Sequence, residues 1–209
     1  SGTSENTLSF SMPASSVSDK TALRRELRQR RRSLSVFAQR RAARALAQQL
    51  AALPALRQAR HLALYWPNDG EIDPRLLRDQ PALRHCHFYL PVLRAFPAGT
   101  LVFAHWPRRA RLARNRFGIP EPRGGVTKTA DALDVMLLPL TGFDAAGRRL
   151  GMGGGFYDRT LAFLLRLPRP RPLLVGVAHA CQQVPQLPAE AWDVPVSAIV
   201  TERAVIRSC

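Results

Sequence analysis

The sequence has few cysteines, few acidic residues and no long apolar run. Its three cysteines, Cys86, Cys181 and Cys209, lie far apart and form no C-x-x-C pair, which argues against a disulfide framework or a zinc site and indicates a reducing compartment. No apolar run approaches the roughly 18–20 residues that a membrane helix needs. We therefore expect a soluble protein of the cytoplasm with no membrane partner.

The shortage of acidic residues leaves the chain strongly basic. Its 209 residues contain 31 Lys and Arg against 15 Asp and Glu, a net charge of +16. Such a surface attracts polyanions, whether nucleic acids, nucleotide phosphates or polycarboxylate substrates. A basic nucleic-acid-binding module is therefore one alternative. The chain has no recognisable nucleic-acid motif, and its aromatic residues are not interleaved with the basic clusters, so nucleic acid is not expected as the main partner.

The length favours one domain, since domains usually run about 100–200 residues. Residues 1–18 are Ser-rich and polar, and we expect a disordered tail or a vector-derived remnant there. Residues 19–209 are expected to form the single domain. It opens with an amphipathic helix capped by Ser18 or Asp19, and a second helix follows Ser35 and ends before Pro54.

Six apolar or β-branched runs follow these two helices and predict strands. They are "HLALYW" (61–66), "HFYLPVL" (87–93), "TLVFAHW" (100–106), "DVMLLPL" (134–140), "RPLLVGVAH" (171–179) and "VSAIVTE" (196–202). Helical stretches are expected near Pro74, at Thr160–Leu167 and around Pro188–Trp192. Continuously apolar strands must be buried on both faces. The pattern predicts an α/β fold of three layers: a mostly parallel, Rossmann-like open sheet with helices on both faces.

A glycine-rich stretch, "RRLGMGGGFYDR" (148–159), lies between a strand end and a helix start. That is the crevice where open α/β sheets bind ligands. Glycines let the backbone take positive φ, so that its N–H groups converge on an anion. The stretch matches neither G-x-x-x-x-G-K-[ST] nor G-x-G-x-x-G. Phosphate binding and a plain tight turn both remain open, and the adjacent Arg148 and Arg149 favour phosphate.

Three acidic residues stand near these features. Asp158 is placed to hold Mg²⁺ on nucleotide phosphates or simply to face a helix dipole, and Asp193 is a second candidate carboxylate. Glu71 follows the aromatic pair Tyr65 and Trp66. An acid beside aromatic rings suits a planar, amide-bearing heterocycle, although a loop acid beside half-buried rings explains the pattern equally well.

Taken together, "DVMLLPLTGFDAAGRRLGMGGGFYDR" (134–159) resembles the signature of the 5-formyltetrahydrofolate cyclo-ligase, or methenyltetrahydrofolate synthetase, family. "KTALRRELRQRRRSLS", "LYWPNDGEID", "LPVL", "LVFAHW", "NRFGIPEP" and "WDVPVSAIVTE" resemble further blocks of that family, in its order, from about Lys20 to Glu202. The resemblance implies an enzyme that converts 5-formyltetrahydrofolate, with ATP and Mg²⁺, into 5,10-methenyltetrahydrofolate, ADP and phosphate.

The resemblance also implies site residues, carried over position by position. The implied ATP contacts are Lys20, Thr21, Ala22, Leu23, Arg24, Arg149, Leu150, Gly151, Met152, Gly153, Gly154, Gly155, Phe156 and Tyr157. The implied folate contacts are Arg24, Trp66, Glu71, Met152, Gly153, Gly154, Gly155 and Phe156. Asp158 and Asp193 are the implied Mg²⁺ ligands, and no residue is implied as a nucleophile.

Three positions depart from the pattern of some relatives. Ser197 stands where many members have an acid after the closing Asp193, which weighs against Asp193 as a metal ligand. Gly154 stands where some relatives carry Lys or Arg, and Phe156 replaces the commoner Tyr. Arg148, Arg149 and Arg159 are the candidates to supply the missing positive charge.

We expect a monomer that acts on 5-formyltetrahydrofolate with or without a polyglutamate tail. An ATP-dependent enzyme of the same fold acting on another folate-like amide is the second alternative.

Overall fold

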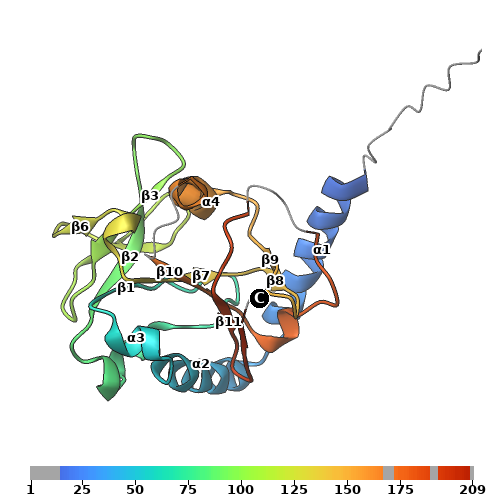
Figure 1. Ribbon diagram of the computed structural model, residues 1–209, viewed down its shortest axis with the longest axis horizontal. Helices are drawn as coiled ribbons and strands as arrows, with labels where there is room; N and C mark the ends of the chain where they lie inside the picture. Colours follow the sequence, from blue (N-terminus) through green and yellow to red (C-terminus); the bar gives the residue numbers. More distant parts are fainter. Residues whose placement is uncertain (1–14, 167–171, 189–192, 208–209) are drawn as a thin grey trace, which may run out of the picture.

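An eight-stranded sheet with helices on both faces organises the chain (Figure 1). This computed structural model describes residues 15–166, 172–188 and 193–207. The α-helices are α1 (Ser15–Arg32), α2 (Val36–Ala51), α3 (Pro54–Gln58) and α4 (Phe156–Leu161). The 3₁₀ helices are η1 (Arg75–Asp79), η2 (Pro81–Leu83), η3 (Ala130–Ala132), η4 (Ala162–Leu165) and η5 (Ala180–Gln182).

The strands form one large sheet and two small hairpins. The large sheet contains β1 (His61–Ala63), β2 (His87–Leu93), β3 (Leu101–His105), β6 (Thr127–Lys128), β7 (Val135–Pro139), β10 (Leu173–Val177), β11 (Ala198–Val200) and β12 (Val205–Arg207). The hairpins pair β4 (Leu112–Arg114) with β5 (Pro120–Pro122), and β8 (Gly142–Phe143) with β9 (Arg149–Leu150).

The strand order in the large sheet is β12-β11-β10-β7-β1-β2-β3-β6. Strands β11, β10, β7, β1 and β2 are parallel, whereas β12, β3 and β6 pair antiparallel with their neighbours. The chain leaves β1 for β2 on one side and returns to β7 on the other. This reversal creates a crevice at the carboxyl ends of β1 and β7, the place where open α/β sheets bind ligands.

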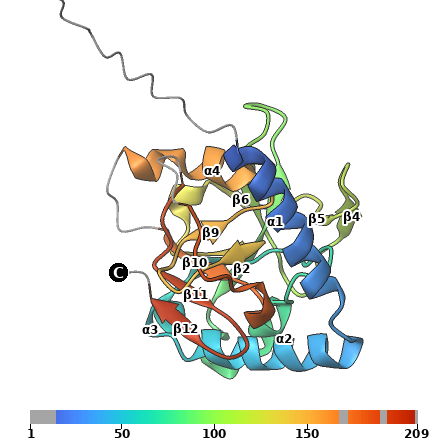
Figure 2. The same ribbon diagram turned by 90° about the vertical axis from the view of Figure 1, so that its right-hand side faces the viewer.

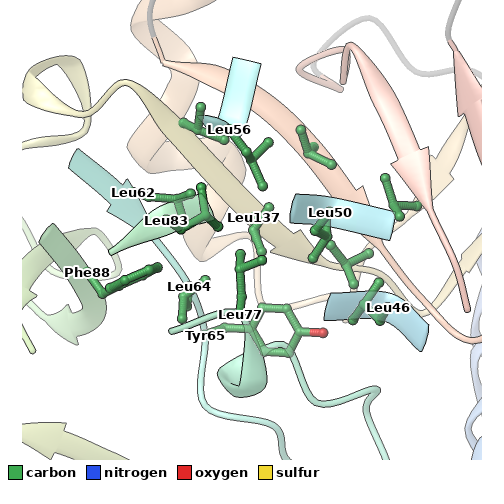
Figure 3. Packing of buried hydrophobic residues seen from close by; sticks show 14 of the residues in the cluster. Leu46, Leu50, Leu56, Leu62, Leu64, Tyr65, Leu77, Leu83, Phe88 and Leu137 are labelled. Carbon is green, nitrogen blue, oxygen red and sulfur yellow. The ribbon is translucent and has the colours of Figure 1, made fainter. Parts of the chain in front are cut away.

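Each face of the sheet has its own apolar core. On one face Leu46 and Leu50 of α2 pack with Leu62, Leu64 and Leu137 (Figure 3). On the other face Leu161 of α4 packs with Met136, Leu138 and Phe103. Successive residues of β7 therefore enter opposite cores, as side-chain alternation in a strand requires. The predicted three-layer, mostly parallel α/β sheet is confirmed.

The two predicted N-terminal helices are confirmed, with differences at their ends. Helix α1 already begins at Ser15, ahead of the predicted cap at Ser18 or Asp19, while residues 1–14 of the predicted tail lie outside the described residues. The side chain of Ser35 accepts a hydrogen bond from the Ala38 N–H and caps α2. The short helix α3 was not predicted; its first residue is Pro54, whose fixed φ suits a helix start.

The first strand is shorter than predicted. Strand β1 ends at Ala63, and Leu64 makes one more hydrogen bond, from its N–H to the Tyr89 carbonyl. Pro67 has no N–H to continue the ladder, so Tyr65 and Trp66 run past the sheet edge. Strands β4, β5, β6, β8, β9 and β12 were not predicted because two or three residues show no period. The helix expected around Pro188–Trp192 falls largely outside the described residues.

Helix α1 lies across the loops at the carboxyl edge of the sheet, beside β9 (Figure 2). Leu27 is fully buried against Leu150 of β9 and the loop residues Val184 and Leu187. A Cβ on Gly142 of β8 would lie 2.5 Å from Leu27 Cδ1, so only glycine admits this close approach. The packing places the polar side of α1 over the crevice between β1 and β7.

Candidate active site

A cavity of about 810 Å³ opens at this crevice. Its walls come from α1, the loop after β1, the β4–β5 hairpin and the segment from β9 into α4. The predicted site residues that line it are Lys20, Arg24, Trp66, Glu71, Asp193 and the whole run Arg149–Asp158. The structure thus brings together residues from four distant parts of the chain.

Three predicted residues do not line this cavity among the described residues: Thr21, Ala22 and Leu23. Lys20, Arg24 and Arg28 recur every four residues and so share the face of α1 that borders the cavity. Leu23 packs instead against the buried cluster of Leu27 and Leu150. A contact of these three residues with ATP stays a prediction.

The glycine turn is held open by arginines. Gly153 and Gly155 have φ of +95° and +65°, a conformation in which side chains are strained. The carbonyls of Gly151 and Met152 accept hydrogen bonds from Arg24 Nε (2.9 Å) and Arg28 Nη2 (3.0 Å). Within the described part of the chain, the N–H groups of Gly153 and Gly155 donate to no backbone carbonyl. The Gly151 and Met152 carbonyls are thus occupied by arginine side chains, whereas N–H groups of the turn remain available for an anion.

Gly154 admits no side chain without a rearrangement. A Cβ there would lie 3.0 Å from Phe156 Cδ2, so the ring occupies the space that a Lys or Arg would need. Arg159 donates from Nη2 to the Gly154 carbonyl (2.7 Å) and from Nε to the Gly99 carbonyl (2.9 Å). Of the three candidates for the missing charge, Arg149 and Arg159 line the cavity. Arg148 does not line it among the described residues and pairs with the buried Asp144 at 2.6 Å.

Glu71 is a nearly buried acid at the floor of this crevice, 7% exposed. Its Oε2 accepts the Asn68 N–H at 3.0 Å, and its Oε1 lies 4.0 Å from Nη2 of the fully buried Arg31. Loss of hydration on burial outweighs both attractions and raises the pKa of Glu71 to about 7. At neutral pH the carboxyl group is therefore poised either to accept or to donate a hydrogen bond.

The loop that carries Glu71 is clamped to α1. Arg31 donates from Nε to the Asp69 carbonyl (2.7 Å) and from Nη2 to its carboxylate (3.1 Å), and Arg32 also pairs with that carboxylate.

Burial raises the pKa of the Tyr157 hydroxyl, and the negative charge of Glu71 adds to the shift. That hydroxyl has no hydrogen-bond partner among the described residues. A bound ligand can therefore satisfy polar groups that the protein leaves open.

The two predicted metal ligands, Asp158 and Asp193, both line the cavity. Arg149 pairs with the Asp158 carboxylate and donates from Nε to the carbonyl of Val194 (3.0 Å), the residue after Asp193. The residues described contain no cluster of three His, Cys, Asp or Glu side chains suited to a metal. Proteins usually bind Mg²⁺ through only one or two carboxylates, and substrate phosphates and water provide its other ligands. The donor set fits a phosphate-held magnesium ion.

Several lining residues were not predicted. Arg28 continues the Lys20–Arg24 spacing by one more turn, and that helical period was the available signal. Asn115 and Phe117 come from the β4–β5 hairpin, whose "NRFGIPEP" block was noted without a role for either residue. The Phe117 ring meets Phe156 edge-on at 5.9 Å. No sequence period reveals that contact, because Phe117 and Phe156 are far apart along the chain and meet only when it folds.

Known proteins are similar to this chain in sequence and in fold. The model of the 5-formyltetrahydrofolate cyclo-ligase family matches residues 16–202. The 5-formyltetrahydrofolate cyclo-ligase of Escherichia coli (strain K12) is 40% identical over 181 residues, 86% of this chain and 98% of that protein. The enzyme of that name from Haemophilus influenzae is 39% identical over 176 residues, 83% of this chain and 92% of that protein.

Solved structures agree with these matches. The NMR structure of Aquifex aeolicus 5,10-methenyltetrahydrofolate synthetase superposes with a TM-score of 0.76 at 34% identity, covering 90% of this chain and 92% of that one. A 5,10-methenyltetrahydrofolate synthetase from Mycoplasma pneumoniae gives a TM-score of 0.68 at 25% identity, covering 88% and 99%. The resemblance drawn from the motifs is confirmed. The chain belongs to the 5-formyltetrahydrofolate cyclo-ligase family.

Proposed function

We propose that this protein converts 5-formyltetrahydrofolate, with ATP and Mg²⁺, into 5,10-methenyltetrahydrofolate, ADP and phosphate. One observation carries the proposal beyond family membership. All residues implied for folate, and all those implied for ATP except Thr21, Ala22 and Leu23, line one continuous cavity at the carboxyl edge of the sheet. A phosphoryl group can pass between two substrates only if a single site holds both in line.

The chemistry requires charge neutralisation and positioning more than a protein nucleophile. The formyl oxygen attacks the γ-phosphorus of ATP and ADP leaves, which turns a poor leaving group into phosphate. N10 of the folate then attacks the activated carbon and loses its proton, and the ring closes as phosphate departs. The lining supplies cations for the charged groups, namely Lys20, Arg24, Arg28, Arg149 and Arg159. Guanidinium groups pair well with phosphate oxygens.

The glycine turn and Arg159 are proposed to hold the phosphates. The N–H groups of Gly153 and Gly155 donate to no backbone carbonyl in the described chain. Arg159 lies beside Gly155 and donates to the Gly154 carbonyl, and Arg24 lies beside Gly153. Asp158 and Asp193 are proposed to hold Mg²⁺, which when bound neutralises and orients the phosphates. Trp66 and Glu71 are proposed to hold the pterin, whose flat ring stacks on the indole while its amide and amino groups meet the carboxyl group.

The experiment is a direct assay. Purified protein is mixed with 5-formyltetrahydrofolate and Mg·ATP, and the absorbance of methenyltetrahydrofolate is followed. Product that requires ATP and divalent metal is the expected result. No product, with ATP and metal shown to bind, refutes the proposal, and turnover of another folate-like amide in its place establishes the alternative substrate.

The pterin assignment is tested separately by Glu71→Gln. Gln can still accept the Asn68 N–H but cannot ionise, so we expect weaker folate binding with ATP binding close to that of the wild type. The matched measurement titrates each ligand alone by calorimetry. Loss of ATP binding with folate binding intact removes Glu71 from the pterin site.

A further inference from the structure

Two arginines of η1 each lie over a tryptophan ring. The Cζ atom of Arg75 is 4.2 Å from the ring centroid of Trp66, and that of Arg78 is 3.6 Å from the ring centroid of Trp106. Residues three apart in a 3₁₀ helix are eclipsed, so both guanidinium groups leave η1 on one side. The two indoles meet each other edge-on at 5.8 Å and 62°.

Arg75 is held in place independently of any ligand. Its Nε and Nη2 donate to Oδ1 and Oδ2 of Asp73 at 2.9 and 2.7 Å, and its backbone N–H donates to the same Oδ1 at 2.9 Å. A bidentate guanidinium–carboxylate pair has a defined orientation. Asp73 lies two residues from Glu71. The loop that carries the Glu71 carboxyl group therefore also sets the plane of the Arg75 guanidinium.

The two members of the Arg75–Trp66 stack border different cavities. Trp66 lines the main cavity, whereas Arg75 lines a second cavity of about 550 Å³ between this loop and α2. Asn68 and Glu71 line both. Arg75 is therefore not placed to touch a ligand in the main cavity, and any effect it has there must pass through the indole.

We propose that Arg75 is a positioning residue for folate recognition, acting by fixing the Trp66 ring that the pterin stacks on. This inference rests on the proposed function. A ring already fixed by Arg75 loses less rotamer freedom when the ligand binds. A cation over one indole face also draws π-electron density toward itself. Its opposite face then becomes a better partner for the electron-rich aminopyrimidinone of a reduced pterin.

The test compares Arg75→Ala with a matched control, Arg78→Ala. Both remove a guanidinium from an indole, but Trp106 is not among the described residues that line the main cavity. With Arg75→Ala we expect 5-formyltetrahydrofolate, titrated without ATP, to bind about fivefold more weakly. We expect its KM to rise by the same factor, with kcat and the affinity for ATP unchanged. Arg78→Ala should bind folate as the wild type does.

A double-mutant cycle shows whether Arg75 acts through the ring. In a Trp66→Ala background, adding Arg75→Ala should cause no further loss of folate affinity. Folate affinity unchanged by Arg75→Ala, an equal loss with Arg78→Ala, or a full further loss in the Trp66→Ala background overturns the proposal. Arg75→Gln, which can still donate to Asp73, gives the same comparison should the alanine variant fail to fold.

These outcomes also separate the two levels of inference. A wild-type protein that makes no methenyltetrahydrofolate refutes the proposed function, and the role of Arg75 falls with it. An active wild type whose Trp66→Ala variant binds folate normally leaves the activity standing and overturns only the Arg75–Trp66 proposal.

Discussion

Replacing Glu71 with Gln should stabilise the folded protein, and only at neutral and alkaline pH. Burial raises the pKa of Glu71 from its ordinary 4.5 to about 7. A group whose pKa is raised by folding binds its proton more tightly in the folded state. The protonated Glu71 contributes its full stability to the folded state below pH 4.5. That stability is lost as the pH rises from 4.5 toward 7, because the unfolded chain ionises while the folded state keeps the proton. Above pH 7 the buried carboxyl group ionises in the folded state too. Gln has no such dependence.

The size of the effect follows from the shift. A pKa difference of about 2.5 units corresponds to about 3 kcal/mol once the pH exceeds 7, since one unit is about 1.4 kcal/mol. At pH 5, where Glu71 is mostly ionised in the unfolded chain but keeps its proton in the folded state, the same linkage gives less than about 1 kcal/mol. Gln keeps the hydrogen bond from Asn68, and Arg31 keeps its closer partner Asp69 at 3.1 Å, so the substitution removes charge with little change of contacts.

The assay is urea denaturation of the wild type and Glu71→Gln at pH 5 and pH 8. We expect an advantage for the variant of less than about 1 kcal/mol in free energy of unfolding at pH 5. At pH 8 the advantage should be about 3 kcal/mol, or about 6–12 °C in Tm for a chain of this size. Equal destabilisation of the variant at both pH values would show that Glu71 is stabilised as an ion by Arg31, and would refute the reasoning. A more stable but less active variant is the trade-off expected of a binding group.

Three further predictions concern the turn, the metal and the core. Gly153→Ala should raise the KM for ATP at least tenfold, because alanine is strained at φ +95°; Gly125→Ala, at φ +90° but outside the cavity lining formed by described residues, is the control for strain alone. Asp158→Asn should raise the Mg²⁺ concentration needed for half-maximal activity, and an unchanged requirement in a metal titration rejects its role as a ligand. Leu46→Ala, at a fully buried position of α2, should lower the free energy of unfolding by about 2–5 kcal/mol, measured by urea denaturation. The KM values for ATP and for 5-formyltetrahydrofolate should not change.

The fold could be predicted where local pattern and burial agree. Continuous apolar runs such as "VMLLP" in β7 must be buried on both sides, which predicts a parallel sheet with helices on both faces. Ser35 shows its cap in the sequence because the side chain bonds a backbone N–H only three residues away. The early end of β1 and the two-residue strands β8 and β9 depend on pairing with distant partners, and no window along the chain contains that information.

The site shows the same division. By itself the sequence showed the glycine-rich stretch, the aromatic–acid pair at Trp66 and Glu71 and, through these and the companion motifs, the family, which in turn implied Lys20 and Arg24. Only the tertiary structure decided that Arg28 and Phe117 join the cavity, that Phe156 fills the space beside Gly154, and that the Arg75 guanidinium lies over the Trp66 ring. Chemistry that resides in residue type and short spacing can be predicted from a sequence. A pKa set by burial, or a ring fixed by a distant contact, depends on which segments the fold brings together.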